Sequence, residues 1–323
     1  MLLEHFGSRW SVFIGGVLST LGFLLSCFVH DHVQLVITFS VFVGVGLGVT
    51  IPVSLVSIEK HFYKKHKLAA AFVTSGVGLG VFALPIAIEQ IEEQLGWPNS
   101  CLILALLCAT ICVASLPLTS PRSSAVAIQS ASNKRDYQKL FQFNMFKSLP
   151  FDVLLVSTFS WHVGFAIILT HLPCYIFEAT SFMTAFDVAA LFSVMGVTHF
   201  SSRLIFIVFS HSAKLDNWST CLCTVVLTAI MTGLHTELFK HKAGEIGYCL
   251  IFAMHWGYYD TFVHDVTEDF IGTELVGKGK GFIALCQALG MLAGPPIAGF
   301  ALDDTGSLKI AFYAAGKCLC VVI

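Results

Sequence analysis

The stretch KHFYKKHKLAAAFVTSGVGLGVFALP, residues 60–85, decides the fold class of this chain. Residues 60–67 contain four lysines and two histidines, whereas residues 68–88 contain no charged side chain. Gly76, Gly78 and Gly80 occupy alternate positions in the uncharged part. A basic loop that leads into an uncharged, glycine-containing helix is typical of a membrane helix at its cytoplasmic end. The alternative is a solvated loop before a buried helix of a soluble protein, and the rest of the chain argues against it.

The composition indicates an integral membrane protein. Of 323 residues, 56% are hydrophobic and only 12% are charged, and the mean hydropathy is +0.80. Soluble domains contain about 25% charged residues. The net charge of −2 gives no reason to expect a nucleic-acid partner. The eleven cysteines lie mostly inside apolar runs, where a free cysteine packs as a small hydrophobic residue.

Uncharged apolar runs predict an all-α membrane bundle of about ten helices. A helix rises about 1.5 Å per residue, so roughly 20 residues cross a bilayer, and all runs except the last are long enough. The predicted helices cover residues 11–29, 33–57, 68–88, 98–118, 150–172, 186–209, 218–236, 245–266, 281–302 and 308–323.

The basic residues predict which side of the membrane each connection faces. Ten crossings place alternate connections on opposite sides, and thirteen basic residues fall on one side against three on the other. The larger set consists of Arg9, Lys60, Lys64, Lys65, Lys67, Arg122, Lys134, Arg135, Lys139, Lys147, Lys214, Lys278 and Lys280. Because cytoplasmic loops carry the excess of lysine and arginine, this bias predicts a cytoplasmic N-terminus.

One long connection, residues 119–149, divides the chain. It is rich in serine, alanine, glutamine and basic residues, which is typical of a flexible linker. Residues 1–118 then form an N-terminal half with four helices, and residues 150–323 form a C-terminal half with six. Since transporters are often built from two halves of six helices, we expect two helices to precede this sequence and the last helix to be clipped.

Several blocks resemble the monocarboxylate transporter family of the major facilitator superfamily. Residues 61–76 are similar to its signature, approximately Tyr-Phe-x-Lys-Arg-Arg-x-Leu-Ala-x-Gly-x-Ala-x-[Ala/Ser]-Gly. The signature positions of this loop and helix are Phe62, Lys64, Lys65, Leu68, Ala69 and Gly76, and the sequence departs at His61, Lys65, His66, Ala71 and Val73. A second block, residues 294–299, looks like the family's eleventh helix. The family's structural and gating residues would here be Pro85, Gly294, Pro295 and Pro296.

The resemblance implies a secondary carrier that works by alternating access in the plasma membrane. Its substrate would be a small organic anion of the lactate and pyruvate class, and proton symport stays open. By the same analogy, an ancillary single-span membrane protein would be a partner. Two alternatives remain: a relative that carries aromatic amino acids or hormones without a proton, and a truncated membrane protein that transports nothing.

Ionisable residues inside the apolar runs are the candidate site, because intramembrane charges usually line a cavity or pair with one another. Arg203 lies inside the run at 186–209, where it can hold a carboxylate bidentately or merely extend to the interface. The resemblance implies that this arginine binds substrate. The family's proton-coupled members have an aspartate four residues earlier, where this chain has His199. We predict that Asp260 pairs with Arg203 when no substrate is bound.

Other polar and aromatic residues are weaker candidates. His162, His255, Trp256 and Tyr259 are expected either to line the cavity or to pack between helices. His255 and His264 are nine residues apart, which places them on opposite helix faces and argues against a metal or haem site. His162 and His171 have the same spacing. No cofactor is expected, and no nucleophile–base pair or phosphate loop suggests an enzyme.

Overall fold

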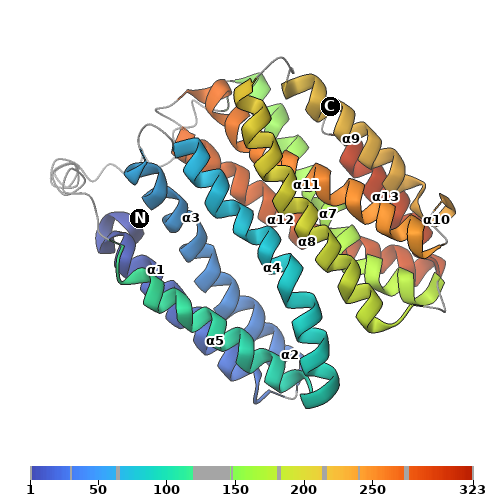
Figure 1. Cartoon of the computed structure of the whole chain (residues 1–323), viewed down its shortest axis with the longest axis horizontal. Coiled ribbons are helices and arrows are strands. Elements are labelled where there is room, and N and C mark those ends of the chain that lie inside the picture. The colour runs from blue at the N-terminus through green and yellow to red at the C-terminus, as the bar shows by residue number, and fades with distance from the viewer. Residues whose placement is uncertain are drawn as a thin grey trace. The chain divides into compact units, whose positions relative to one another are not determined.

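The computed structural model describes residues 2–29, 31–62, 66–118, 146, 148–179, 183–212, 217–238, 241–272 and 276–321. Every regular element in these residues is helical (Figure 1). The chain divides into two compact units, residues 1–74 with 87–137 and residues 75–86 with 138–323. The halves expected at 1–118 and 150–323 stay a prediction, and the linker at 119–149 lies almost entirely outside the described residues.

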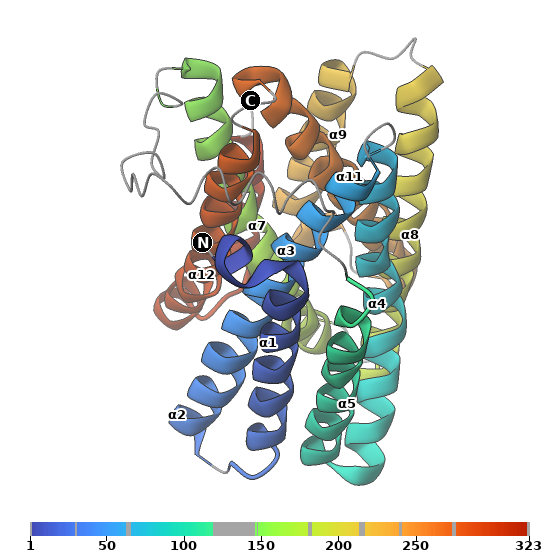
Figure 2. The ribbon, with the colours of Figure 1, turned by 90° about the vertical axis from the view of Figure 1, so that its left-hand side faces the viewer.

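The first unit is built on α1, which contacts both α3 and α5 (Figure 2). A kink at Gly7, whose φ of 73° lies in the left-handed region, interrupts α1 near its start. The small core of this unit consists of Phe23, Val43, Ala105 and Cys108. Its helices are α1 (Leu2–Ser26), α2 (His32–Leu35), the π-helix η1 (Val36–Val43), α3 (Gly44–His61), the two ends of α4 (His66–Leu95), and α5 (Trp97–Ser115).

The second unit holds the larger core. In it α7 packs against α12 and α13, α8 packs against α11, and α9 packs against α11 and α13. Its most deeply buried large side chains include Trp161, Tyr248 and Tyr259. Its helices are α7 (Leu149–Ala179), α8 (Ala185–Ser212), α9 (Asn217–Gly233), α10 (His235–Leu238), α11 (Lys242–Ile271), α12 (Val276–Thr305) and α13 (Lys309–Cys320).

The helices agree with the predicted class, an all-α membrane protein, and each of the ten predicted ranges overlaps a helix. In the described part of the chain, seven helices are long and apolar enough to cross a membrane. They cover Gly7–Ser26, Val33–Leu55, Phe72–Leu95, Trp97–Ser115, Leu149–Phe177, Ala185–Phe206 and Gly277–Thr305. The protein is therefore a multi-pass integral membrane protein. Ten crossings stay a prediction, because α9 and α13 are short and α11 contains several acidic residues.

Only some of the glycines allow close helix approach. A Cβ atom on Gly46 would lie 2.6 Å from the carbonyl oxygen of Gly15, so α1 and α3 cross there almost backbone to backbone. A Cβ atom on Gly78 would lie 2.7 Å from the backbone nitrogen of Phe200 in α8. At Gly44, Gly48, Gly76 and Gly80, by contrast, a Cβ atom would meet nothing within 4 Å.

Candidate functional site

The packing of α8 against α11 positions the three ionisable residues predicted from the sequence. The two helices approach closely at Gly257, where a Cβ atom would lie 2.8 Å from the carbonyl oxygen of His199. One turn further along each helix are Arg203 and Asp260. Because the contacts advance in the same direction on both helices, α8 and α11 run parallel, and the two charged side chains reach the same level.

Arg203 and Asp260 form an ion pair, as predicted from the sequence. The distance from Arg203 Nη2 to Asp260 Oδ2 is 2.7 Å. The Arg203 side chain is 5% exposed and that of Asp260 is 22% exposed. Arg203 Nε is also buried and has no hydrogen-bond partner among the described residues. The guanidinium therefore keeps donors that a second carboxylate can use.

His199 lies one turn before Arg203 and is fully buried. Neither of its ring nitrogens has a hydrogen-bond partner in the described part of the chain. Its ring packs against Trp256, with ring centroids 4.4 Å apart. A buried polar ring without partners is costly in free energy, so it is a candidate for hydrogen bonding to a ligand. His199, Arg203, Trp256 and Asp260 thus form one cluster, which we call the α8–α11 cluster.

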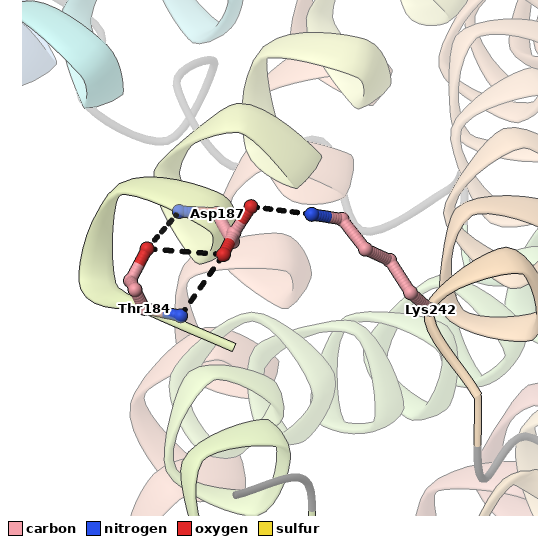
Figure 3. Close-up of polar contacts among 3 residues, drawn as sticks. All are labelled: Thr184, Asp187 and Lys242. Carbon is pink, nitrogen blue, oxygen red and sulfur yellow. Dashed lines mark hydrogen bonds and ion pairs between the residues drawn. The ribbon is translucent and has the colours of Figure 1, made fainter. Parts of the chain in front are cut away.

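A polar clamp joins the same two helices at their first turns (Figure 3). Thr184 and Asp187 form a reciprocal cap at the start of α8: the Asp187 backbone N–H donates to Thr184 Oγ1, and the Thr184 backbone N–H donates to Asp187 Oδ2. Lys242, the first residue of α11, donates to the other oxygen of Asp187. Since both helices begin at this clamp, it helps to set the register that brings Arg203 to Asp260.

His255 and Tyr259 occupy a different face of α11. His255 Nε2 accepts a hydrogen bond from Trp161 Nε1 at 3.0 Å, so the ring proton is on Nδ1, which lies 3.2 Å from Thr224 Oγ1. Tyr259 stacks on Trp161 with ring centroids 4.3 Å apart. These contacts join α7, α9 and α11. Of the two roles expected for this pair, packing between helices is the one that the geometry favours.

His162 in α7 is buried and adjoins this aromatic group. Its Nδ1 lies 2.8 Å from the carbonyl oxygen of Thr158. Because a carbonyl only accepts, Nδ1 carries the proton, and a neutral ring then keeps a lone pair on Nε2. His162 is 6.5 Å from Tyr259, ring centroid to centroid, and lies outside the α8–α11 cluster.

The signature residues fall in the first unit or on α4. Lys64 and Lys65 lie outside the described residues, as does the side chain of Leu68. Phe62 is the C-cap residue that follows α3, and it is 55% exposed. Ala69 is half-buried in α4, and Gly76 has open space around it.

The proline-containing block of α12 packs on α7. A Cβ atom on Gly294 would lie 2.6 Å from the carbonyl oxygen of Val163, so this glycine allows the two helices to approach closely. Pro295 and Pro296 lie inside α12, and Pro85 lies inside α4. Both helices continue past their prolines.

Some important residues were not singled out from the sequence. Trp161 supports His255 and Tyr259, and Gly257 sets the α8–α11 crossing. His235 and Glu245 form a fully buried pair, with 2.9 Å between Nε2 and Oε2. For this pair the sequence offers a weak signal: His235 lies at the end of one predicted helix, and Glu245 begins the next. None of these contacts follows from periodicity within one helix.

The sequence is similar to known proteins along almost its whole length. Residues 1–316 match the sequence model of the Major Facilitator Superfamily. Rat monocarboxylate transporter 4 is 24% identical over 98% of this chain and 67% of that protein. Rat monocarboxylate transporter 2 is 25% identical over 98% of this chain and 68% of that protein. Human monocarboxylate transporter 14 is 24% identical over 98% of this chain and 76% of that protein.

Solved transporter structures share the fold. The D-xylose–proton symporter superposes with a TM-score of 0.67 at 17% identity, covering 99% of this chain and 80% of that one. The E. coli fucose:proton symporter superposes with a TM-score of 0.66 at 14% identity, covering 99% and 83%. Sequence and fold agree: the chain belongs to the Major Facilitator Superfamily, and its relatives there are monocarboxylate transporters.

Proposed function

We propose that this protein is a secondary carrier that moves a small monocarboxylate, of the lactate and pyruvate class, by alternating access between its two halves. The observation that carries the proposal is the largely buried Arg203–Asp260 ion pair beside His199, whose ring nitrogens have no hydrogen-bond partner among the described residues. A cation that already holds one carboxylate inside the membrane is suited to exchange it for another. The relatives named as monocarboxylate transporters support the choice of substrate.

In the proposed binding step, the substrate carboxylate displaces Asp260 from Arg203. The guanidinium can offer two parallel N–H groups to a carboxylate, whereas the hydrogen bond described to Asp260 comes from Nη2 alone. His199 then donates to the substrate's carboxylate or to its neighbouring oxygen. Trp256 packs beside the imidazole and shields this group from water.

We propose that the displaced Asp260 takes up a proton. With the substrate carboxylate on Arg203, an ionised Asp260 would leave one uncompensated negative charge in the cluster. Charges buried without a partner are strongly unfavourable, so protonation of Asp260 restores neutrality. This gives proton symport a route although His199 replaces the aspartate that the family's proton-coupled members have.

The setting of the carrier is also part of the proposal. We propose that it resides in the plasma membrane, that the N-terminus and the linker at 119–149 face the cytoplasm, and that an ancillary single-span protein assists it. The thirteen basic residues on one side support the orientation. Epitopes inserted in the linker should react with antibody only after the cells are permeabilised. Labelling of intact cells would contradict this orientation.

Uptake of radiolabelled lactate into liposomes containing the full chain tests the function, with and without an inward proton gradient. We expect uptake by the wild type to rise with the gradient. Arg203→Gln should weaken lactate binding about tenfold to a hundredfold, because a charged hydrogen bond contributes about 1.5–3 kcal/mol. Asp260→Asn should abolish the effect of the gradient. Lys309→Met, in an exposed ion pair, is the matched control and should behave as the wild type.

Several outcomes would contradict the proposal. Equal uptake by the wild type and Arg203→Gln would show that Arg203 does not bind the substrate. If the proton gradient still raises uptake in Asp260→Asn, Asp260 does not take up the proton, but the proposed substrate binding is unaffected. Uptake of an aromatic amino acid in place of lactate or pyruvate would assign the chain to the alternative substrate class.

A further inference from the structure

His162, in the middle of α7, is a buried histidine with one ring nitrogen available to another group. Its Nδ1 donates to the carbonyl oxygen of Thr158 at 2.8 Å. Because the proton is on Nδ1, the neutral ring carries a lone pair on Nε2 and can accept one more hydrogen bond. No hydrogen bond from a described residue reaches Nε2. The substrate contacts proposed above do not use this ring.

Two buried hydroxyl groups beside His162 also lack partners. Thr158 Oγ1 and Tyr259 Oη are buried and have no hydrogen-bond partner in the described part of the chain. Thr158 lies one turn before His162 on α7, and the Tyr259 ring of α11 is 6.5 Å from the imidazole, centroid to centroid. From α12 only a glycine meets this ring: a Cβ atom on Gly290 would lie 2.9 Å from His162 Cβ. The contact between α7 and α11 therefore contains unused polar atoms, which buried sites rarely leave unpaired without a function.

Asp260 lies on the part of α11 that faces both α7 and α8. Tyr259 faces α7, where it stacks on Trp161, and Gly257 faces α8. Successive residues of a helix are about 100° apart, so Asp260 is about 100° from Tyr259 and about 60° from Gly257, on the arc between them. The charge of Asp260 accordingly acts on His162 of α7 as well as on His199 of α8. A turn of its side chain away from α8 directs the carboxyl group toward α7.

Among the described histidines around Asp260, His162 is the one that is free to receive this carboxyl group. His255 has partners on both ring nitrogens. His199 lies one turn from Arg203, and in the proposed binding step it donates to the substrate. From α8, Arg203 and His199 thus face Asp260 on the substrate side, and from α7 His162 faces it on the other side.

We propose that Asp260, once the substrate has displaced it from Arg203, holds its proton in a hydrogen bond to His162 Nε2. A hydronium ion gives a proton to one carboxylate oxygen of Asp260: an O–H bond forms there, an O–H bond of hydronium breaks, and its electron pair stays on water. Water can deliver this proton because the Asp260 side chain is 22% exposed. The new O–H donates to Nε2, and the imidazole stays neutral. This inference rests on the proposed function and names the group that retains the coupled proton.

The role of His162 has a characteristic dependence on pH. A protonated Asp260 donates to Nε2, so losing this acceptor weakens the protonated complex about tenfold, the usual effect of one hydrogen bond. An ionised Asp260 has no proton to donate, so it gains nothing from the lone pair of Nε2. Removing the acceptor should therefore weaken substrate binding at low pH, and the loss should shrink as pH rises and the complex forms without its proton. A purely structural defect would weaken binding equally at every pH.

The test measures lactate binding to the purified full chain in detergent micelles by titration calorimetry, from about pH 6 to about pH 9. His162→Phe keeps a ring but removes the acceptor, and it should bind lactate about tenfold more weakly than the wild type at about pH 6. The difference should decrease toward about pH 9. His162→Gln keeps an acceptor oxygen and should recover part of the loss. His171→Phe, the same change at a half-buried position of α7, is the matched control and should bind as the wild type does at each pH.

Two results would overturn the proposal while leaving lactate binding by the wild type intact. One is equal binding by the wild type and His162→Phe at every pH, and the other is the same loss at every pH. If His162→Phe does not fold, nuclear magnetic resonance of the wild type with 15N-labelled histidine replaces it: lactate should shift the His162 Nε2 signal at low pH, and an unchanged signal would overturn the proposal. A wild type that binds no lactate at any pH would instead refute the proposed function, and this inference with it.

Discussion

Replacing Asp260 with Asn should destabilise the protein far more than its location in one salt bridge suggests. Charge centres about 4 Å apart attract by about 4 kcal/mol at an effective dielectric constant of about 20. Removing Asp260 leaves Arg203, only 5% exposed, without its counterion. Breaking a buried pair in this way costs about 3–5 kcal/mol, and the partial exposure of Asp260, 22%, places this case near 3 kcal/mol.

The reverse change should cost less. Arg203→Gln leaves Asp260, which water can partly hydrate, so we expect a loss of about 1–2 kcal/mol, and a similar loss in the double variant. The coupling energy of the double-mutant cycle should then be about 3 kcal/mol, whereas independent sites add within about 0.5 kcal/mol. Unfolding in mixed micelles measures all four proteins.

A matched cycle on the exposed pair Glu237–Lys309 provides the control. Both partners are about half exposed, so its coupling energy should stay below about 1 kcal/mol. Additive losses for Arg203 and Asp260, or equal coupling in the two cycles, would refute the reasoning that burial makes this pair strong.

Three further changes test the packing around the site. Gly257→Ala should lower the free energy of unfolding by about 1–3 kcal/mol, because the new Cβ would lie 2.8 Å from a backbone carbonyl oxygen of α8. Gly247→Ala is the control and should not destabilise the protein, because its Cβ would meet nothing within 4 Å. Thermal unfolding compares the two variants. His255→Leu should lower the free energy of unfolding by about 1–3 kcal/mol, because it leaves the indole N–H of Trp161 unpaired. His255→Gln can accept that hydrogen bond and should recover part of the loss. Equal losses in the two variants would contradict a stabilising role for this hydrogen bond. Thr184→Ala should lower the free energy of unfolding by about 1 kcal/mol, because it removes the cap of α8, whereas Thr184→Ser should cost little. If Thr184→Ala is as stable as the wild type, the clamp does not stabilise the protein.

The two buried histidines of the second unit illustrate why position in the fold decides function. His255 has partners on both ring nitrogens, whereas His199 has none among the described residues. Both lie inside helices of the second unit, His199 in α8 and His255 in α11. His199 is therefore available to a ligand, while His255 stabilises the packing of α7, α9 and α11.

Much of the architecture was predictable from local pattern. The uncharged run after residue 67 and its repetition along the chain predict membrane helices, because a spanning segment must satisfy its own backbone and exclude charge. Intramembrane charge also singles out Arg203 and Asp260, and their pairing is confirmed at 2.7 Å. The motifs at residues 61–76 and 294–299 pointed to the superfamily that the comparison confirmed.

The sequence by itself determined that this is a helical membrane protein with charged residues at particular positions inside its apolar runs. These features depend on the hydrophobicity and charge of individual residues, which can be read along the chain. Which helices touch was decided only in three dimensions. Gly46 and Gly78 meet neighbouring backbone while their companion glycines do not, and Gly257 sets the register of α8 and α11. His235 and Glu245 meet across the α10–α11 connection within an aromatic group. Such contacts depend on packing between helices, which the period of a single helix does not encode.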